Sequence, residues 1–125
     1  MSKPTVAILG ASRNRAKFGN KSVRAHARQG YDVFPINPYA TEIEGLRAYP
    51  NLASVPVSPL DRISVYLPPD VVLTMLPEIQ ACHAREVWLN PGSDSPAVVA
   101  RAEELGLELI RACSIVDVGV SPATL

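Results

Sequence analysis

Residues 6–22, V-A-I-L-G-A-S-R-N-R-A-K-F-G-N-K-S, place a basic loop between a short apolar run and a segment with helical character. Gly10 lacks a Cβ atom, so the chain can turn sharply there and a bound group can approach the main chain closely. Backbone N–H groups at the start of a helix carry partial positive charge and attract anions. This arrangement is typical of a phosphate site.

Basic side chains surround the expected helix start near Phe18 and Gly19, and Ser12 adds a hydroxyl group. Guanidinium and ammonium groups donate charge-assisted hydrogen bonds to phosphate oxygens. The loop therefore predicts a ligand that carries phosphate. Exposed cations are also common on surfaces, so simple solvation is an alternative for Arg15 and Lys21. The basic residues of the segment are Arg13, Arg15, Lys17 and Lys21.

Charge is unevenly distributed along a chain whose formal net charge is zero. Residues 1–40 carry seven Lys or Arg and one Asp, whereas residues 41–125 carry five Lys or Arg and eleven Asp or Glu. The basic excess therefore lies in and just after the loop. A balanced total gives no general case for nucleic acid or an anionic membrane surface as partner.

Cys82 and Cys113 are too few for a disulfide framework, and no apolar run approaches the roughly 20 residues that a membrane span needs. The N-terminal apolar region is too short for a secretory signal, since it passes directly into the first expected strand. We therefore expect a reducing cytoplasm as the location.

Apolar runs rich in β-branched residues alternate with segments of helical character. Helices are expected over Gly19–Gln29, from the segment Pro68-Pro69-Asp70 onwards with a kink or restart at Pro77, and over Ala97–Leu105 after an N-cap at Ser95. Residues 37–60 predict a loop with at most one helical turn. The expected strands are Thr5–Leu9, Tyr31–Ile36, Ile63–Leu67, Glu86–Leu89 and Leu107–Ile110.

This alternation predicts an α/β fold, a Rossmann-like open parallel sheet of about five strands with helices on both faces. We expect the strand order 3-2-1-4-5 and a single domain over residues 1–125. Ligands of such sheets bind beyond the carboxyl ends of the strands, where the strand order reverses. The loop after the first strand lies at that point.

Two common phosphate ligands fit the loop poorly. A dinucleotide fingerprint needs G-x-G-x-x-G and an acidic residue after the second strand, but the next glycine after Gly10 is Gly19 and the strand is followed by Asn37. A P-loop needs G-K-[ST], which is absent. Coenzyme A carries a ribose 3′-phosphate that a carboxylate would repel. The neutral Asn37 therefore favours coenzyme A.

Several motifs occur in an order that resembles the CoA-binding domain family: VAILGAS…KFG, YDVFPINP, EIEGLRAYPNLASVP, SVYLPP, VWLNPG and ELIRAC. The family includes the N-terminal module of the succinyl-CoA synthetase α-subunit and of NDP-forming acyl-CoA synthetases. This chain is more similar to small stand-alone bacterial members. The resemblance covers nearly the whole chain and implies CoA or acyl-CoA as the bound molecule.

The resemblance also implies positions for the ligand. The diphosphate would lie on the loop and the helix start, adenosine beside Asn37 and Pro38, and two later segments would form the opposite wall. The family places a lysine after the second strand where this chain has Tyr39, so an aromatic contact or Arg13 would have to substitute. The implied site comprises Gly10, Ala11, Ser12, Arg13, Asn14, Arg15, Lys17, Phe18, Gly19, Asn37, Pro38, Leu67, Pro68, Pro69, Trp88, Leu89 and Asn90.

No catalytic constellation is evident, and the phosphorylated histidine of the synthetase lies in a domain beyond this module. His26 and His83 have no Ser or Asp partner nearby in sequence, and Glu103 with Glu104 indicates a solvated helix face. Cys113 follows a cation at the expected ligand edge, which raises the hypothesis of a mixed disulfide with the CoA thiol.

The sequence thus predicts a non-catalytic CoA-binding protein, with no metal site, and with a homodimer or an enzyme partner as open possibilities. Two alternatives remain at this stage. One is an NAD(P)-binding oxidoreductase-type domain on the same fold. The other is an interaction subunit of an acyl-CoA enzyme whose nucleotide site has decayed.

Overall fold

The first strand, β1 (Thr5–Leu9), is apolar from Val6 to Leu9 because both of its faces are covered there. Val6 and Ile8 pack in one core cluster, whereas Ala7 and Leu9 pack in another on the opposite face. All four side chains are at most 1% exposed. The absence of polar alternation in this run is therefore a consequence of burial on both sides.

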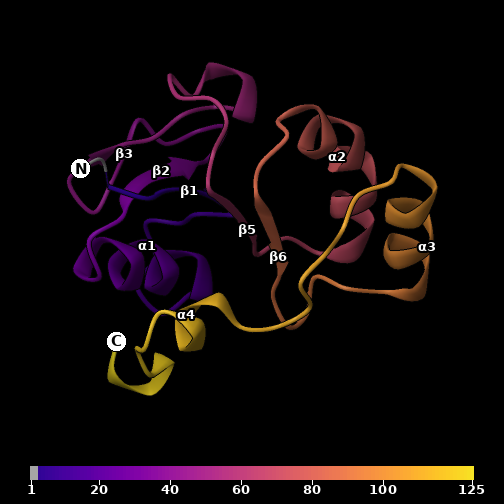
Figure 1. Ribbon diagram of the computed structural model, residues 1–125. Coiled ribbons are helices and arrows are strands. Elements are labelled where there is room, and N and C mark those ends of the chain that lie inside the picture. The colour runs from indigo at the N-terminus through magenta and orange to yellow at the C-terminus, as the bar shows by residue number, and fades with distance from the viewer. Residues whose placement is uncertain (1–2) are drawn as a thin grey trace.

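The computed structural model describes residues 3–125 and contains a four-stranded parallel sheet (Figure 1). Its strands are β1, β2 (Asp32–Ile36), β5 (Arg62–Val65) and β6 (Glu86–Leu89), in the order β2-β1-β5-β6. The predicted Rossmann-like α/β sheet is confirmed. The predicted strand order is wrong, since the third long strand lies beside the first and not beyond the second.

Residues 37–60 explain the different order, because they cover the edge of β2. A hairpin of β3 (Glu42–Ile43) and β4 (Leu46–Arg47) leads to Tyr49, which bridges Ile36 in parallel. The Tyr49 N–H group donates to the Pro35 carbonyl oxygen at 2.8 Å. This contact takes the place beside β2 that the predicted order gave to a strand. The 3-10 helix η1 (Leu52–Ser54) supplies the one expected helical turn.

The fifth predicted strand is reduced to one bridge between Ile110 and Trp88. Ile110 donates its N–H to the Val87 carbonyl at 2.8 Å and accepts from the Leu89 N–H at 2.8 Å. The sheet therefore holds four strands and a short edge contact, one strand fewer than the prediction.

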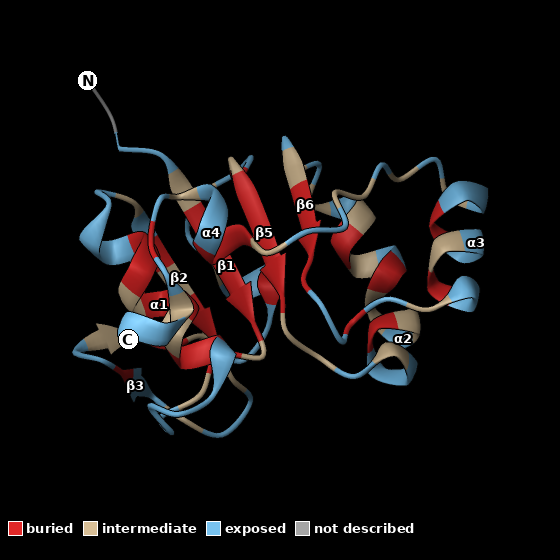
Figure 2. Ribbon diagram, turned by 90° about the horizontal axis from the view of Figure 1, so that it is seen from below, coloured by how far each residue is buried: buried red, intermediate tan, exposed pale blue. Residues whose placement is uncertain are grey.

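Helices cover both faces of the sheet (Figures 1 and 2). On one face, α1 (Phe18–Arg28) and the short α4 (Ser114–Asp117) contact each other, and η2 (Pro122–Thr124) ends the chain. On the other face, α2 (Pro69–Ala81) packs against α3 (Pro96–Glu104).

Local signals locate these helices well. Helix α2 begins at Pro69, within the expected segment, and continues as one helix through Pro77, so the alternative of a restart there is wrong. The Ser95 hydroxyl accepts from the Val98 N–H at 3.2 Å, which is the expected N-cap of α3. Helix α1 begins one residue before the predicted Gly19.

A buried arginine connects the sheet to the C-terminal segment. Arg62 is 5% exposed, and its Nη2 atom lies 3.0 Å from Glu86 Oε1 and 2.7 Å from Asp117 Oδ2. The guanidinium also lies over the Trp88 ring, 4.5 Å from its centroid. Paired and stacked in this way, the charge is tolerated inside the fold.

His26 belongs to the same buried cluster. Its Nδ1 atom lies 2.8 Å from the Ser22 carbonyl oxygen, and its Nε2 atom lies 3.5 Å from Arg62 Nη1. Burial lowers the pKa of His26 to about 4, and the Arg62 charge acts in the same direction. This histidine is therefore neutral in the folded chain near pH 7.

We expect the free energy of unfolding to fall by about 3 kcal/mol as the pH decreases from 6.5 to about 4, because the unfolded chain binds a proton that folded His26 does not. Above pH 6.5 this contribution is fully present. Urea denaturation at several pH values measures it. The variant His26→Asn should flatten that part of the profile, whereas His83→Asn at an exposed position should not. Identical profiles for the wild type and His26→Asn would contradict the assignment.

Candidate functional site

Two glycines allow the backbone of the loop after β1 to lie directly against the backbone at Tyr66 and at the start of α1. Gly10 has φ +86°, and a Cβ atom there would lie 2.5 Å from the Tyr66 carbonyl oxygen. A Cβ atom on Gly19 would overlap the carbonyl oxygen of Gly10. The first turn of α1 therefore lies directly against the end of β1, an approach that only glycine permits.

Asparagine side chains fix the conformation of this loop. Asn14 Oδ1 accepts from the Ala16 N–H at 3.0 Å, and Asn20 Nδ2 donates to the Ser12 carbonyl at 2.8 Å. Asn37 Nδ2 donates to the Ala11 carbonyl at 3.0 Å, which ties the end of β2 to the same loop. Asn14 and Asn37, predicted as ligand contacts, thus also shape the loop itself.

Sequence reasoning missed three residues that hold the loop from outside. Asn20 Nδ2 also donates to Glu44 Oε2 at 3.1 Å, and its Oδ1 accepts from Arg24 Nε at 2.8 Å. Arg24 Nη2 donates to the Arg15 carbonyl at 2.8 Å. These partners lie on α1 and the β3–β4 hairpin, and no local sequence signal identifies them.

The loop cations fall into two groups. Arg15 forms an ion pair with Glu44, with Nη1 3.2 Å from Oε1, and Lys21 Nζ donates to the Pro122 carbonyl at 3.2 Å. Arg13 and Lys17 are exposed and make no ion pair within residues 3–125. These two cations are therefore the ones available to an anion.

A cavity of about 530 Å³ opens at the carboxyl ends of β1, β5 and β6, where the strand order reverses. One side is the loop and the start of α1, and the other side is formed by the segments after β5 and β6. We call it the loop cavity. It is lined by Gly10, Ala11, Ser12, Lys17, Phe18, Gly19, Asn37, Tyr66, Leu67, Pro68, Pro91, Gly92 and Ser93.

A second cavity of about 320 Å³ adjoins the loop cavity and shares Ser12 and Asn37 with it. We call it the side cavity. No carboxylate lines either cavity within the described part of the chain. The side cavity is lined by Ser12, Arg13, Asn14, Asn37, Tyr39 and Ala40.

Several predicted site residues lie elsewhere. Trp88 is 6% exposed, and Leu89 and Asn90 are each 1% exposed, so their side chains belong to the interior. The wall expected from them is instead formed by the next turn, Pro91 to Ser93. Pro38 and Pro69 line neither cavity, and Arg15 is occupied by its ion pair.

Tyr66 is a cavity residue that the prediction missed, although it lies within the predicted strand Ile63–Leu67. Its hydroxyl lies 2.8 Å from Ser114 Oγ, which in turn lies 2.6 Å from Ser64 Oγ. Burial raises the pKa of Tyr66. The Tyr66 hydroxyl is therefore held by hydrogen bonds and neutral at neutral pH.

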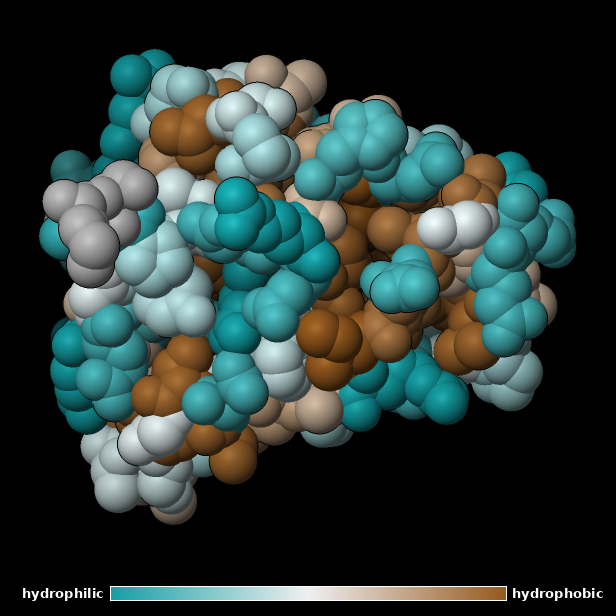
Figure 3. Space-filling model, in the orientation of Figure 1, coloured by the Kyte–Doolittle hydropathy of each residue, from teal (hydrophilic) through white to brown (hydrophobic). Residues whose placement is uncertain are grey.

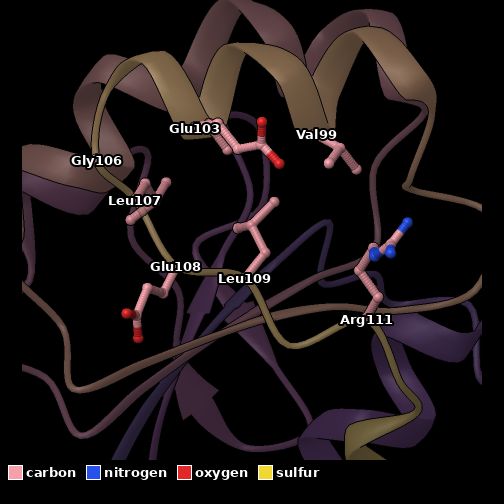
Figure 4. Close-up of a pocket in the computed structure, with 8 residues that line it drawn as sticks. Val99, Glu103, Gly106, Leu107, Glu108, Leu109 and Arg111 are labelled. Atoms are coloured by element: carbon pink, nitrogen blue, oxygen red, sulfur yellow. The ribbon is translucent and has the colours of Figure 1, made fainter.

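A larger cavity of about 610 Å³ lies far from this loop, between α3 and residues 106–111 (Figure 4). Figure 3 shows apolar surface gathered in a hollow in this part of the molecule. Its charged lining residues are Glu103, Glu108 and Arg111, so acids outnumber bases. Such a lining disfavours phosphate, and the loop cavity remains the candidate site.

The loop cavity combines a tight backbone turn, a helix start with free N–H groups and the free cation Lys17, and the adjoining side cavity adds Arg13. Together these groups suit an anionic nucleotide. The sequence matches the profile of the CoA binding domain over residues 4–119. The chain belongs to the CoA binding domain family.

Solved structures agree with this membership. A conserved hypothetical protein from Pyrococcus furiosus is 30% identical with a TM-score of 0.80, and the match covers 93% of this chain and 99% of that one. A protein from Thermus thermophilus is 30% identical with a TM-score of 0.81, and the match covers 92% of this chain and 87% of that one.

A longer enzyme contains a similar module. The dinucleotide-forming acetyl-coenzyme A synthetase 1 of Ca. Korarchaeum cryptofilum, in complex with phosphate and ADP, is 26% identical with a TM-score of 0.72. The match covers 86% of this chain but 25% of that enzyme. The present chain therefore corresponds to one part of the synthetase.

Two further findings concern the described residues alone. Within residues 3–125, no helix is both long and apolar enough to cross a bilayer. The same residues form no group of three or more His, Cys, Asp or Glu that could hold a metal ion.

Proposed function

We propose that this chain binds coenzyme A or an acyl-CoA through its loop cavity and catalyses no reaction of its own. The observation that carries the proposal is the backbone contact between Gly10 and Gly19, which places the start of α1 at the switch point of a CoA binding domain. We further propose a single domain over residues 1–125, of which residues 1 and 2 lie outside the described part, and a cytoplasmic location, which suits two free cysteines.

The diphosphate of CoA would lie on the loop. In the described part of the chain, the N–H groups of Phe18 and Gly19 have no hydrogen-bond partner. No acidic residue occupies the first turn of α1, so the positive end of the helix dipole is not offset. Two N–H donors, the dipole and the Lys17 ammonium would therefore meet the phosphate oxygens together.

A binding role without catalysis is supported by the lining of the loop cavity. Neither His nor Cys is among its lining residues in the described chain. Ser12 and Ser93 line it, but neither hydroxyl is hydrogen-bonded to a histidine or a carboxylate in residues 3–125. An activated nucleophile requires such a base.

Asn37 supports CoA over a dinucleotide. Its side-chain amide is committed to the Ala11 carbonyl, and its Oδ1 accepts from the N–H groups of Tyr39 and Ala40. The carboxylate that would receive the ribose hydroxyls of NAD is thus replaced by an amide with a structural role. We therefore expect NAD to bind more weakly than CoA.

Isothermal titration calorimetry of the purified chain with CoA, NAD and ATP tests the proposal. We expect saturable binding of CoA that is at least tenfold tighter than that of NAD or ATP. Equal affinities for the three ligands, or no binding of CoA, would overturn the proposal. Tight NADPH binding with hydride turnover would instead support the oxidoreductase alternative.

Lys17→Ala should weaken CoA binding by about tenfold, because it removes one charge-assisted contact to the diphosphate. Lys21→Ala is the matched control, since the Lys21 ammonium already donates to Pro122. Calorimetry of both variants measures the effect. Equal losses in the two variants would indicate a general charge effect and contradict a specific role for Lys17.

A further inference from the structure

The sheet has an open edge beyond β6. Ile110 bonds to β6 through both its N–H group and its carbonyl oxygen, so the corresponding groups of Leu109 and Arg111 point away from β6. Within residues 3–125, these outward N–H and carbonyl groups have no hydrogen-bond partner. Unpaired backbone groups at a sheet edge are a template on which a further strand can pair.

A groove follows this open edge. The cavity of about 610 Å³ adjoins one of about 500 Å³ that extends to the start of α3, and both are lined by Val99, Glu103 and Arg111. We call the two together the edge groove. In Figure 4, α3 forms one wall, Leu109 and Arg111 point toward it, and Glu108 points away. Successive side chains of a strand added here would likewise alternate between the α3 side and the opposite side.

The edge groove is apolar where α3 faces the open edge. Val99 of α3 lines it together with Leu107 and Leu109 of the edge, and all three residues are half-buried. Apolar surface therefore remains accessible to solvent between the helix and the edge. Apolar side chains of an added strand would cover this surface, which favours association.

The charges of the edge groove are mostly negative. Three carboxylates and one guanidinium line it, and none of the four forms an ion pair within residues 3–125. A second copy of this chain, paired edge to edge, would bring like charges together, which opposes such pairing. Basic side chains complement the groove instead. Its charged residues are Asp94, Glu103, Glu108 and Arg111.

We propose that the edge groove binds an extended peptide segment in which basic and apolar residues alternate, added to the sheet as a further strand. Its main chain bonds to the outward groups of Leu109 and Arg111. Its apolar side chains pack against Val99 on the α3 side, and its basic side chains on the opposite side meet Glu108. The edge groove lies outside the loop cavity, so this inference is independent of the proposed function.

The synthetic peptide acetyl-VKVKVKV-amide is the probe, titrated into the ¹⁵N-labelled chain and followed by backbone amide shifts. We expect saturable changes led by Leu109 and Arg111, with the loop after β1 unaffected. The acidic peptide acetyl-VEVEVEV-amide should bind at least about tenfold more weakly. No binding of the basic peptide, or equal binding of the two peptides, would overturn the proposal.

Backbone methylation of the probe tests strand pairing on the wild-type chain. In one version the main-chain nitrogens of the lysines are methylated, and in the other those of the inner valines. Because neighbouring N–H groups of a strand point to opposite edges, one version should lose at least about tenfold in affinity and the other should keep it. Equal affinities of the two versions would show that the peptide does not pair as a strand.

Variants of the chain test the same contacts from the protein side. Leu109→Pro removes an outward N–H group and should weaken the probe at least about tenfold more than Leu109→Ala, which shortens the side chain alone. Glu108→Gln should weaken it several-fold. Glu104→Gln is the matched control, since its carboxylate is held by Arg101 at 3.1 Å and lines neither cavity.

Sedimentation of the chain alone tests the competing occupant. We expect a monomer whose mass does not change in Leu109→Pro. A dimer that Leu109→Pro dissociates would assign the open edge to a second copy of the chain and overturn the proposal. Equal effects of Glu108→Gln and Glu104→Gln on the probe would likewise contradict the role given to Glu108.

Discussion

Replacing Gly19 by alanine is expected to abolish CoA binding and to lower the free energy of unfolding by about 3 kcal/mol. The new Cβ atom would overlap the Gly10 carbonyl oxygen, and both groups belong to backbone that cannot rotate away. Relief requires the first turn of α1 to move from the end of β1. That movement displaces the N–H groups of Phe18 and Gly19 from the loop cavity.

Gly30→Ala is the matched control for this prediction. Gly30 has φ +87°, and nothing lies within 4 Å of a Cβ atom there, so the substitution adds backbone strain of about 1 kcal/mol without a clash. It lies at the other end of α1 and should leave CoA affinity unchanged. Urea denaturation and calorimetry measure both properties. A Gly19→Ala variant that binds CoA like the wild type would show that the close approach is not needed.

Arg62→Ala is expected to lower the free energy of unfolding by about 3 kcal/mol. The substitution leaves Glu86 and Asp117 facing an empty space without their counter-charge, and it removes the cation from the face of Trp88. Both carboxylates are 42% exposed, so the cost falls at the lower end of the range for a broken buried ion pair.

Arg85→Ala is the control for charge loss alone. Arg85 lies 3.5 Å from Asp61, but its side chain is 76% exposed, so we expect a loss below about 1 kcal/mol. Arg62 is the first residue of β5, at the opposite end of the strand from the loop cavity. Arg62→Ala should therefore retain CoA binding below its melting temperature. Equal stability losses in the two variants would contradict the role assigned to the buried cluster.

Elements with a local cause were predictable from the sequence. The apolar run of β1, the proline that opens α2 and the Ser95 cap each depend on residues within a few positions. The sharp turn at Gly10 after β1 was likewise predictable, whereas the role of this loop as the ligand site stays a prediction. The family resemblance predicted CoA as the ligand, which composition and spacing alone left open.

Features that depend on distant contacts were not predictable. The strand order was wrong because Tyr49 and the β3–β4 hairpin cover the edge of β2. The pairing of Arg15 with Glu44 joins residues that meet only after the hairpin has folded against α1. Glu44 and Gly45 have φ of 51° and 76°, which is the conformation of a tight hairpin turn. The Glu-Gly pair of this turn was the sequence signal from which the hairpin could have been predicted.

The residues that line the loop cavity after β6 were likewise not predictable one by one. Trp88 and Leu89 alternate between the two faces of a sheet that is covered on both sides, so neither side chain can reach the edge. The chain becomes accessible only at Pro91, after the strand has ended. A motif match identifies the segment, but burial decides which of its residues a ligand can touch.

Titration of the ¹⁵N-labelled chain with CoA, followed by backbone amide chemical shifts, tests most directly whether the loop after β1 holds the ligand. We predict the largest changes at residues 10–19, led by Phe18 and Gly19, with smaller changes at Tyr39 and at residues 91–93. Changes concentrated on α3 and residues 106–111, with the loop unaffected, would place the ligand in the cavity of Figure 4 and contradict the account.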